Sequence, residues 1–126
     1  MAGYQQEREL SVKVNTTSLV GKQYYIVAFD TTQGGVVLAN AQTLPIAGIL
    51  KTEGVVGDIV NVVLPQKGTM KVKVGSAGIA INTYVTADTA GLAVATTSAG
   101  DMVIGRALQA GNSGDIIEIA LMYFRY

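Results

Sequence analysis

The chain has 126 residues with no cysteine and no histidine, and its 9 basic and 9 acidic side chains cancel to a net charge of zero. The length fits one domain, and the missing residue types exclude disulfides, thiolate metal sites and the commonest general base. Zero net charge gives no bulk attraction to nucleic acid or to an anionic membrane. Charged residues make up only 14% of the chain, against roughly 25% in ordinary soluble domains. A surface on the order of 6,400 Å² is thinly covered by so few charges, which predicts that other subunits or a large partner cover part of it.

The first segment, MAGYQQEREL, lacks the basic start and apolar centre of a secretory signal. Its polar residues precede any core pattern, and Leu10, Val12 and Val14 then alternate with polar residues as they would in a strand. We expect residues 1–18 to form an N-terminal arm that can add a strand to the sheet edge of a neighbour. Residues 19–126 are expected to form a β-barrel-like body. A frayed terminus is the alternative interpretation of the arm.

The body has the composition of a β protein. The whole chain contains 38 β-branched residues, and its 15 glycines are spaced so that few windows could hold a three-turn helix. Short apolar runs between turn residues predict an all-β fold, a small barrel or sandwich. The predicted strands are Leu10–Val14, Gln23–Phe29, Val36–Ala39, Ile46–Leu50, Ile59–Leu64, Thr69–Val74, Tyr84–Thr86, Ala93–Ala95, Met102–Ala107 and Ile116–Phe124.

One phrase recurs along the chain. GDIVNVVL occupies 57–64, GDIIEIAL occupies 114–121, and GDMVIGRAL occupies 100–108. Glycine supplies backbone freedom at a tight turn, and aspartate can bond the neighbouring backbone there, so each phrase is interpreted as a turn that opens a strand. Two explanations stay open, convergence of short strands and an internal duplication. The residues assigned to these structural turns are Gly57, Asp58, Gly100, Asp101, Gly114 and Asp115.

Alternation assigns the strand faces in the first two phrases. Val60, Val62 and Leu64 should point to one side, with Ile117, Ile119 and Leu121 in the matching positions. The polar members, Asn61 and Glu118, should point the other way, towards solvent.

Groups that could carry catalysis are sparse. Serine and threonine are plentiful, but the chain has no histidine to activate them. Glu7 and Glu9 fall in the arm, and the Gly-Asp aspartates fall in turns that already explain them. LVGKQ at 19–23 fails the phosphate-loop pattern, because position 16 is threonine and position 23 is glutamine. We therefore expect no enzyme, no cofactor, no metal site and no small-molecule substrate. A Ser–Lys pair stays formally possible, with no spacing that selects among Lys22, Lys51, Lys67, Lys71 and Lys73.

No segment is suited to cross a membrane as a helix, because the longest uncharged run, 31–50, is interrupted by polar residues and proline. The closing YFRY at 123–126 could offer stacking rings to nucleic acid, but without a basic stripe a final strand is the better interpretation. Neither a membrane nor a nucleic acid is predicted as a partner.

Several short elements in order resemble the small capsid decoration (cement) proteins of tailed bacteriophages. They are KQYYIVAFDTTQGGVVLA (22–39), IAGILKTEGVVGDIVNVVLPQKGTMKVKV (46–74), AGIAINTYVTADTAGLAVA (77–95) and MVIGRALQAGNSGDIIEIAL (102–121). The resemblance covers about residues 20–122 and depends on the order of the pieces, since no single piece is specific.

The resemblance implies a homotrimer that is made in the host cytoplasm and binds the major capsid protein on the outer surface of a phage head. Such proteins clamp the expanded shell without catalysis or cofactor. The residues expected to contact the capsid from the arm are Tyr4, Arg8, Leu10, Val12 and Val14. A rival class is a β-rich carbohydrate-binding or fibre-like module, for which Tyr24, Tyr25 and Tyr84 would be the ring platform.

Overall fold

The computed structural model describes residues 9–43 and 45–126, which form ten strands and no helix. This confirms the all-β prediction, and within these residues no helix is long and apolar enough to cross a membrane. All ten predicted strands are present. They are β1 (Glu9–Lys13), β2 (Ile26–Phe29), β3 (Val36–Leu38), β4 (Gly48–Leu50), β5 (Ile59–Val63), β6 (Thr69–Lys73), β7 (Tyr84–Ala87), β8 (Ala93–Ala95), β9 (Met102–Ala107) and β10 (Ile116–Arg125).

The largest differences in strand length lie at β2 and β4. β2 begins three residues later than predicted because Tyr24 has a left-handed backbone, with φ of 71°, a conformation that does not continue a strand. Its N–H donates to the carbonyl of Leu50, while the N–H of Tyr25 turns back to Lys22. β4 is also shorter than predicted, beginning at Gly48.

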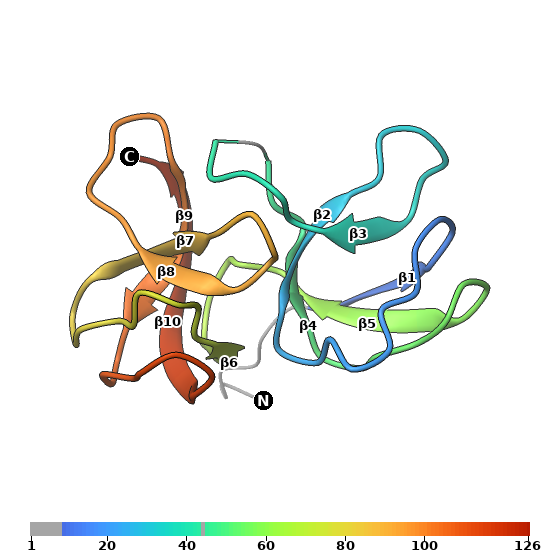
Figure 1. The fold of residues 1–126 in the computed structure, drawn as a ribbon. Coiled ribbons are helices and arrows are strands. Elements are labelled where there is room, and N and C mark those ends of the chain that lie inside the picture. Colours follow the sequence, from blue (N-terminus) through green and yellow to red (C-terminus); the bar gives the residue numbers. More distant parts are fainter. Residues whose placement is uncertain (1–8, 44) are drawn as a thin grey trace, which may run out of the picture.

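The strands form two antiparallel five-stranded sheets (Figure 1). β1 to β5 build the first lobe, residues 9–64, and β6 to β10 build the second lobe, residues 69–126. The second sheet curls on itself, as the bridge between Val74 and Ala93 shows. The body predicted as one sheet system therefore consists of two similar lobes.

The two lobes have the same topology. The first sheet has the order β1-β5-β4-β2-β3 and the second β6-β10-β9-β7-β8, so adding five to each strand number converts one into the other. The register agrees as well, because Val27 pairs with Gly48 in the first lobe and Val85 pairs with Gly105 in the second. Identical order with identical register supports internal duplication over convergence of isolated strands.

The matched topology reveals a longer sequence likeness than the Gly-Asp phrase alone. Residues 46–64 and 103–121 align without a gap. Irregular backbone is also repeated: Tyr24 and Asn82 both have positive φ, 71° and 68°, and both N–H groups donate to the end of the neighbouring strand. The identical pairs in the aligned segment are Gly48/Gly105, Gly54/Gly111, Gly57/Gly114, Asp58/Asp115, Ile59/Ile116 and Leu64/Leu121.

Each lobe has its own core, built from equivalent positions. The core of the first lobe contains Val27, Val60 and Val62, and their equivalents Val85, Ile117 and Ile119 lie in the core of the second. The predicted inward positions are confirmed for five residues, Val60, Val62, Ile117, Ile119 and Leu121, whereas Leu64 lies just beyond β5 and is half-buried. On the other side Asn61 is half-buried and Glu118 is exposed. The second core also takes in side chains from the first lobe, Ile26, Ile49 and Val63. The two lobes are therefore joined by apolar packing as well as by the chain.

Candidate functional site

The Gly-Asp phrases at 57–58 and 114–115 are the same turn. The Asp58 carboxylate accepts the N–H of Val55 at 3.0 Å, and the Asp115 carboxylate accepts the N–H of Asn112 at 2.9 Å. Each aspartate N–H donates back to the carbonyl of that same residue, at 3.0 Å in both turns. The preceding glycines have φ of 100° and 86°, values that L side chains rarely adopt. Both carboxylates are thus used in shaping the turns that open β5 and β10.

The third phrase forms a different turn. Gly100 again has positive φ, 95°, and the Asp101 N–H donates to Ser98 at 3.3 Å. The Asp101 side chain is buried, however, and accepts the hydroxyl of Thr96 rather than a backbone N–H in its own turn. It precedes β9, so its position in the second lobe does not match that of Asp115.

The remaining aspartates also lie in turns. Asp88 accepts the N–H groups of Ala90 and Leu92, and Asp30, its equivalent in the first lobe, accepts those of Thr32 and Gln33. All five aspartate carboxylates are therefore occupied by hydrogen-bond donors. Among the residues that the structure describes, no group of three His, Cys, Asp or Glu side chains could hold a metal ion.

Asp30 is the carboxyl group whose titration should affect stability. The N–H of Thr32 and the hydroxyl of Thr16 both donate to it, and they hold the pKa of Asp30 below its ordinary value of 3.8. A lowered folded-state pKa stabilises the fold above the unfolded value, and this contribution is lost as the pH falls from 3.8 through the folded pKa.

We expect Asp30→Asn to lower the melting temperature near neutral pH, with the difference from wild type shrinking as the pH falls from about 5 towards 2. Asparagine keeps an acceptor for Thr32 but carries no charge to lose. Thermal melts of both proteins across this range measure the effect. A difference that stays constant with pH would show that Asp30 does not titrate differently in the folded and unfolded chain.

The segment predicted as an arm is part of the first sheet over the residues described. β1 pairs antiparallel with β5 of the same chain, with Leu10 opposite Val62 and Val12 opposite Val60. Leu10 and Val12 are half-buried, and Val14 is completely buried in the core of the first lobe. Val14 thus has no exposed surface to offer a partner. Tyr4 and Arg8, the other predicted contacts, lie outside the described residues.

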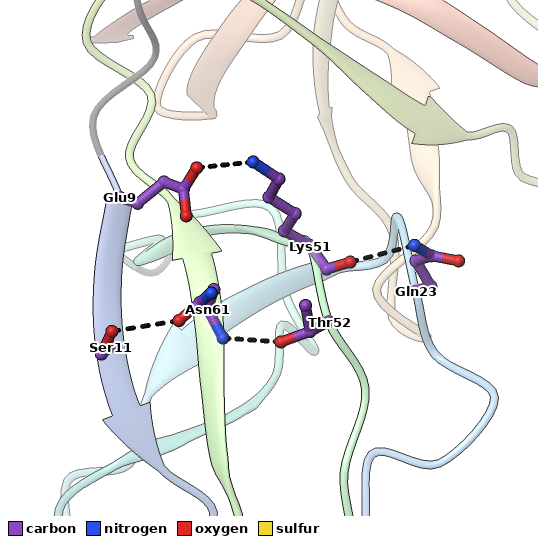
Figure 2. Close-up of polar contacts among 6 residues, drawn as sticks. All are labelled: Glu9, Ser11, Gln23, Lys51, Thr52 and Asn61. Atoms are coloured by element: carbon purple, nitrogen blue, oxygen red, sulfur yellow. Dashed lines mark hydrogen bonds and ion pairs between the residues drawn. The ribbon is translucent and has the colours of Figure 1, made fainter.

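Polar contacts fasten the outer side of β1 to its own lobe (Figure 2). Ser11 donates its hydroxyl to the Asn61 side chain at 3.0 Å, and the Asn61 N–H donates to the hydroxyl of Thr52 at 2.9 Å. The Lys51 amine pairs with the Glu9 carboxylate at 2.6 Å. β1 is nevertheless at the edge of its sheet, where a strand offers backbone groups to a further chain.

A groove of about 430 Å³ lies between the two lobes, and Lys51 and Thr52, which take part in these contacts, line one side of it. Its wall includes Met70 and Tyr24, together with the polar side chains of Gln23, Lys71 and Glu118. Glu118 accepts the hydroxyl of Thr69 at 3.3 Å. Six of the eight residues that line the groove are polar or charged, whereas pockets that bind small molecules are lined mainly by apolar and aromatic side chains.

The three tyrosines proposed as a sugar platform belong to separate clusters. The Lys22 and Lys73 amines lie over the Tyr25 ring, 4.9 and 5.7 Å from its centroid. Tyr84 lies in the second lobe, where its ring packs edge-on against Phe124 at 5.2 Å and Tyr126 at 6.0 Å.

The cluster around Tyr84 is the surface feature that the sequence did not single out. Its rings come from β7 and from the end of β10, and Arg106 adds a guanidinium 4.8 Å from the Tyr84 centroid and a hydrogen bond to its hydroxyl. The closing YFRY was a visible signal, but its partners Tyr84 and Arg106 are distant in sequence. Large apolar side chains elsewhere are also exposed, among them Val20, Phe29, Val55, Val56, Ile59, Ile81, Leu108 and Ile116.

The comparisons with known proteins give a match of fold. No family model matches the chain, and no curated protein matches by sequence. Among solved structures, the chain is similar to the N base of the head fiber gp8.5 of bacteriophage phi29, with a TM-score of 0.72 and 17% sequence identity. The likeness covers 96% of this chain and 98% of the other, so both lobes and their connection have counterparts in one known fold.

Proposed function

We propose that this chain is a structural protein of a phage virion that binds as a trimer to the outer surface of the head and stabilises the expanded shell. Its role is mechanical and needs neither catalysis nor cofactor. Its partners are the major capsid protein and two further copies of itself.

The observation that carries the proposal is the whole-length likeness to the N base of a phage head fiber. A TM-score of 0.72 over 96% of the chain includes both lobes. The order of sequence elements between residues 20 and 122 separately resembles head decoration proteins, and the two lines of comparison lead to the same particle.

The surface supports a protein that is covered in its working state. The monomer exposes 6203 Å², and its exposed large apolar side chains include Phe29, Val56, Ile59 and Tyr126, each at least 44% accessible. Only 18 charged side chains are available to keep such a surface wet. Covering these large apolar side chains with a partner would remove apolar surface from water, which favours association.

The mechanism that we propose is avidity. A trimer bound at a three-fold position makes three linked contacts with the shell, and linkage can raise affinity by about 10²–10⁴ over a single contact. Rupture of the shell then requires several contacts to break together. Because each single contact with the shell is weak, incompletely bound copies would dissociate and rebind until every three-fold position of the shell is occupied.

Binding of the purified protein to expanded, undecorated heads tests the proposal. Co-sedimentation should saturate at a fixed number of copies per head, and decorated heads should survive heating that opens bare ones. Heads that have not expanded are the matched control. Absence of binding to heads of the phage that encodes the chain would refute the proposed function.

We expect removal of residues 1–8 to weaken head binding at least about 10-fold, since Tyr4 and Arg8 are of the residue types that dominate interface energetics. β1 begins at Glu9, so this deletion leaves the first sheet intact, whereas a cut at residue 14 would remove β1 and the buried Val14. Affinity for heads and the melting temperature are measured together. Unchanged affinity would exclude residues 1–8 as a capsid contact and leave Leu10 and Val12 as the remaining candidates in the predicted arm.

A second candidate is the base of a longer head fibre. The match to a fibre base favours it, and the two functions share attachment to the head. Electron microscopy of heads saturated with the chain distinguishes low knobs from the roots of projecting fibres.

A further inference from the structure

The two lobes meet through unlike surfaces. The first lobe contributes a row on the outer face of its sheet, in which Ile26 pairs with Ile49 and Ile49 with Val63. All three side chains are completely buried, in one cluster with side chains of the second lobe. We call this row the inserted row.

The second lobe contributes a different region, which we call the receiving end, residues Met70, Ala87, Gly91, Met102 and Leu121. The Gly91 carbonyl accepts the N–H of Ile26 at 2.7 Å, and the Met102 N–H donates to the carbonyl of Gln42. The four side chains of the receiving end are at most 8% exposed. The contact is therefore head to tail, with an inserted row of one lobe against the receiving end of the next.

The equivalent of the inserted row in the second lobe is only partly covered. Tyr84 pairs with Arg106 and Arg106 with Ala120, in the register of the buried row. Arg106 is exposed, Tyr84 and Ala120 are half-buried, and the Phe124 ring against Tyr84 is 36% exposed. The inserted row of the first lobe, which is always buried, consists of aliphatic side chains. The equivalent row of the second lobe contains a tyrosine and an arginine, residue types that suit a surface that is in water before a partner binds to it.

The equivalent of the receiving end in the first lobe is also uncovered. Phe29 is 50% exposed, whereas its counterpart Ala87 is completely buried. A Cβ added to Gly91 would lie 2.9 Å from the Ile26 carbonyl oxygen, whereas at the equivalent Gly34 the nearest atom, on Asn15, is 4.0 Å away. A groove of about 260 Å³ lies here, lined by Phe29 and Pro45 among others.

We propose that the Tyr84–Arg106–Ala120 row of one copy binds the Phe29 end of the first lobe of a second copy, repeating the contact that already joins the lobes. Such a contact uses two different surfaces, so it propagates from copy to copy and closes into a ring where the rotation allows. Three copies would place six similar lobes in one ring. The inference deepens the proposed function, whose self-association it relies on, by locating the seam between copies.

A matched pair of variants on one strand tests the seam. Ala120→Glu places a charge in the centre of the row and removes almost no side-chain packing. Ile116→Glu places the same charge on the same face of β10, at a position whose equivalent Ile59 stays 63% exposed beside the lobe contact. By sedimentation velocity, Ala120→Glu should have the 13.1 kDa mass of one chain at concentrations where wild type and Ile116→Glu are oligomers. Equal masses for all three would overturn the proposal.

Mixing provides a measurement that misfolding cannot imitate. Phe29→Asp should also be monomeric, because it places a charge on the Phe29 end of the first lobe, the other surface of the proposed contact. An equimolar mixture of Phe29→Asp and Ala120→Glu should form a heterodimer, since each variant keeps the surface that the other lacks. Two monomeric variants that never combine would refute a head-to-tail seam, as would a contact made by like surfaces.

Binding to heads separates this inference from the proposed function. A wild-type chain that is monomeric in solution yet binds heads, and loses that binding on Ala120→Glu, would assign the row to the capsid protein and overturn the seam. A chain that forms the oligomer by this seam but never binds heads would uphold the seam and refute the decoration function.

Discussion

Gly105→Ala is expected to lower the free energy of unfolding by about 2–3 kcal/mol, in the range that overpacking costs in a tight core. A Cβ at this position would lie 2.6 Å from the carbonyl oxygen of Ala120 and 2.8 Å from the Ile119 side chain. The carbonyl belongs to the neighbouring strand, so relief requires β9 and β10 to separate. Urea unfolding followed by circular dichroism measures the change.

The duplication predicts a matched effect at Gly48. Its added Cβ would lie 2.2 Å from the carbonyl oxygen of Val63, the residue equivalent to Ala120, so Gly48→Ala should destabilise at least as much as Gly105→Ala. Gly57→Ala is the control. It meets no atom within 4 Å and pays only for its positive φ, about 1–2 kcal/mol. A smaller effect at Gly105 than at Gly57 would contradict this account of the paired glycines.

These glycines mark the limit of what the sequence could predict. Short apolar runs bounded by turn residues located all ten strands, because both signals are local properties of the sequence. The close approach of β4 to β5 at Gly48 depends on strand neighbours, which a single sequence does not give. The left-handed Tyr24 was equally hidden, since tyrosine has no preference for that conformation and tertiary contacts impose it.

The duplication was only partly visible for a similar reason. Gly57-Asp58 and Gly114-Asp115 repeat because a turn geometry constrains them. Inserted-row positions such as Ile26 and Tyr84 differ in residue type as they differ in burial, since Ile26 is completely buried between the lobes and Tyr84 is half-buried at the surface. Selection on burial thus erased the sequence likeness at the surfaces where the lobes differ in function.

The placement of the N-terminal segment also needed three dimensions. Alternation correctly predicted a strand at Leu10–Val14, but alternation does not say whose sheet the strand joins. The structure pairs β1 with β5 of its own chain. Any capsid contact made by the N-terminal segment must therefore use residues before Glu9, the outer face of β1 or its open edge.

Ile49 and Arg106 occupy equivalent positions in the two lobes, and we expect the buried Ile49 to contribute most of the free energy of interaction between the lobes. Ile49→Ala is expected to cost about 2–5 kcal/mol, the range for truncating a buried isoleucine, because its side chain is completely buried between the lobes. Arg106→Ala, at the equivalent position, should cost about 1 kcal/mol or less, since it loses only an exposed contact with the Tyr84 ring and hydroxyl.

Denaturant unfolding of both variants, with the slope and midpoint fitted separately, measures this pair. The core shared between the lobes should make wild type unfold in one cooperative transition, and Ile49→Ala should shift its midpoint or split it into two. Equal costs at the two positions would mean that the lobes are held by the linker and not by the inserted row. In that case the row would be a poor template for a contact between copies, so this stability measurement on single chains also bears on the assembly.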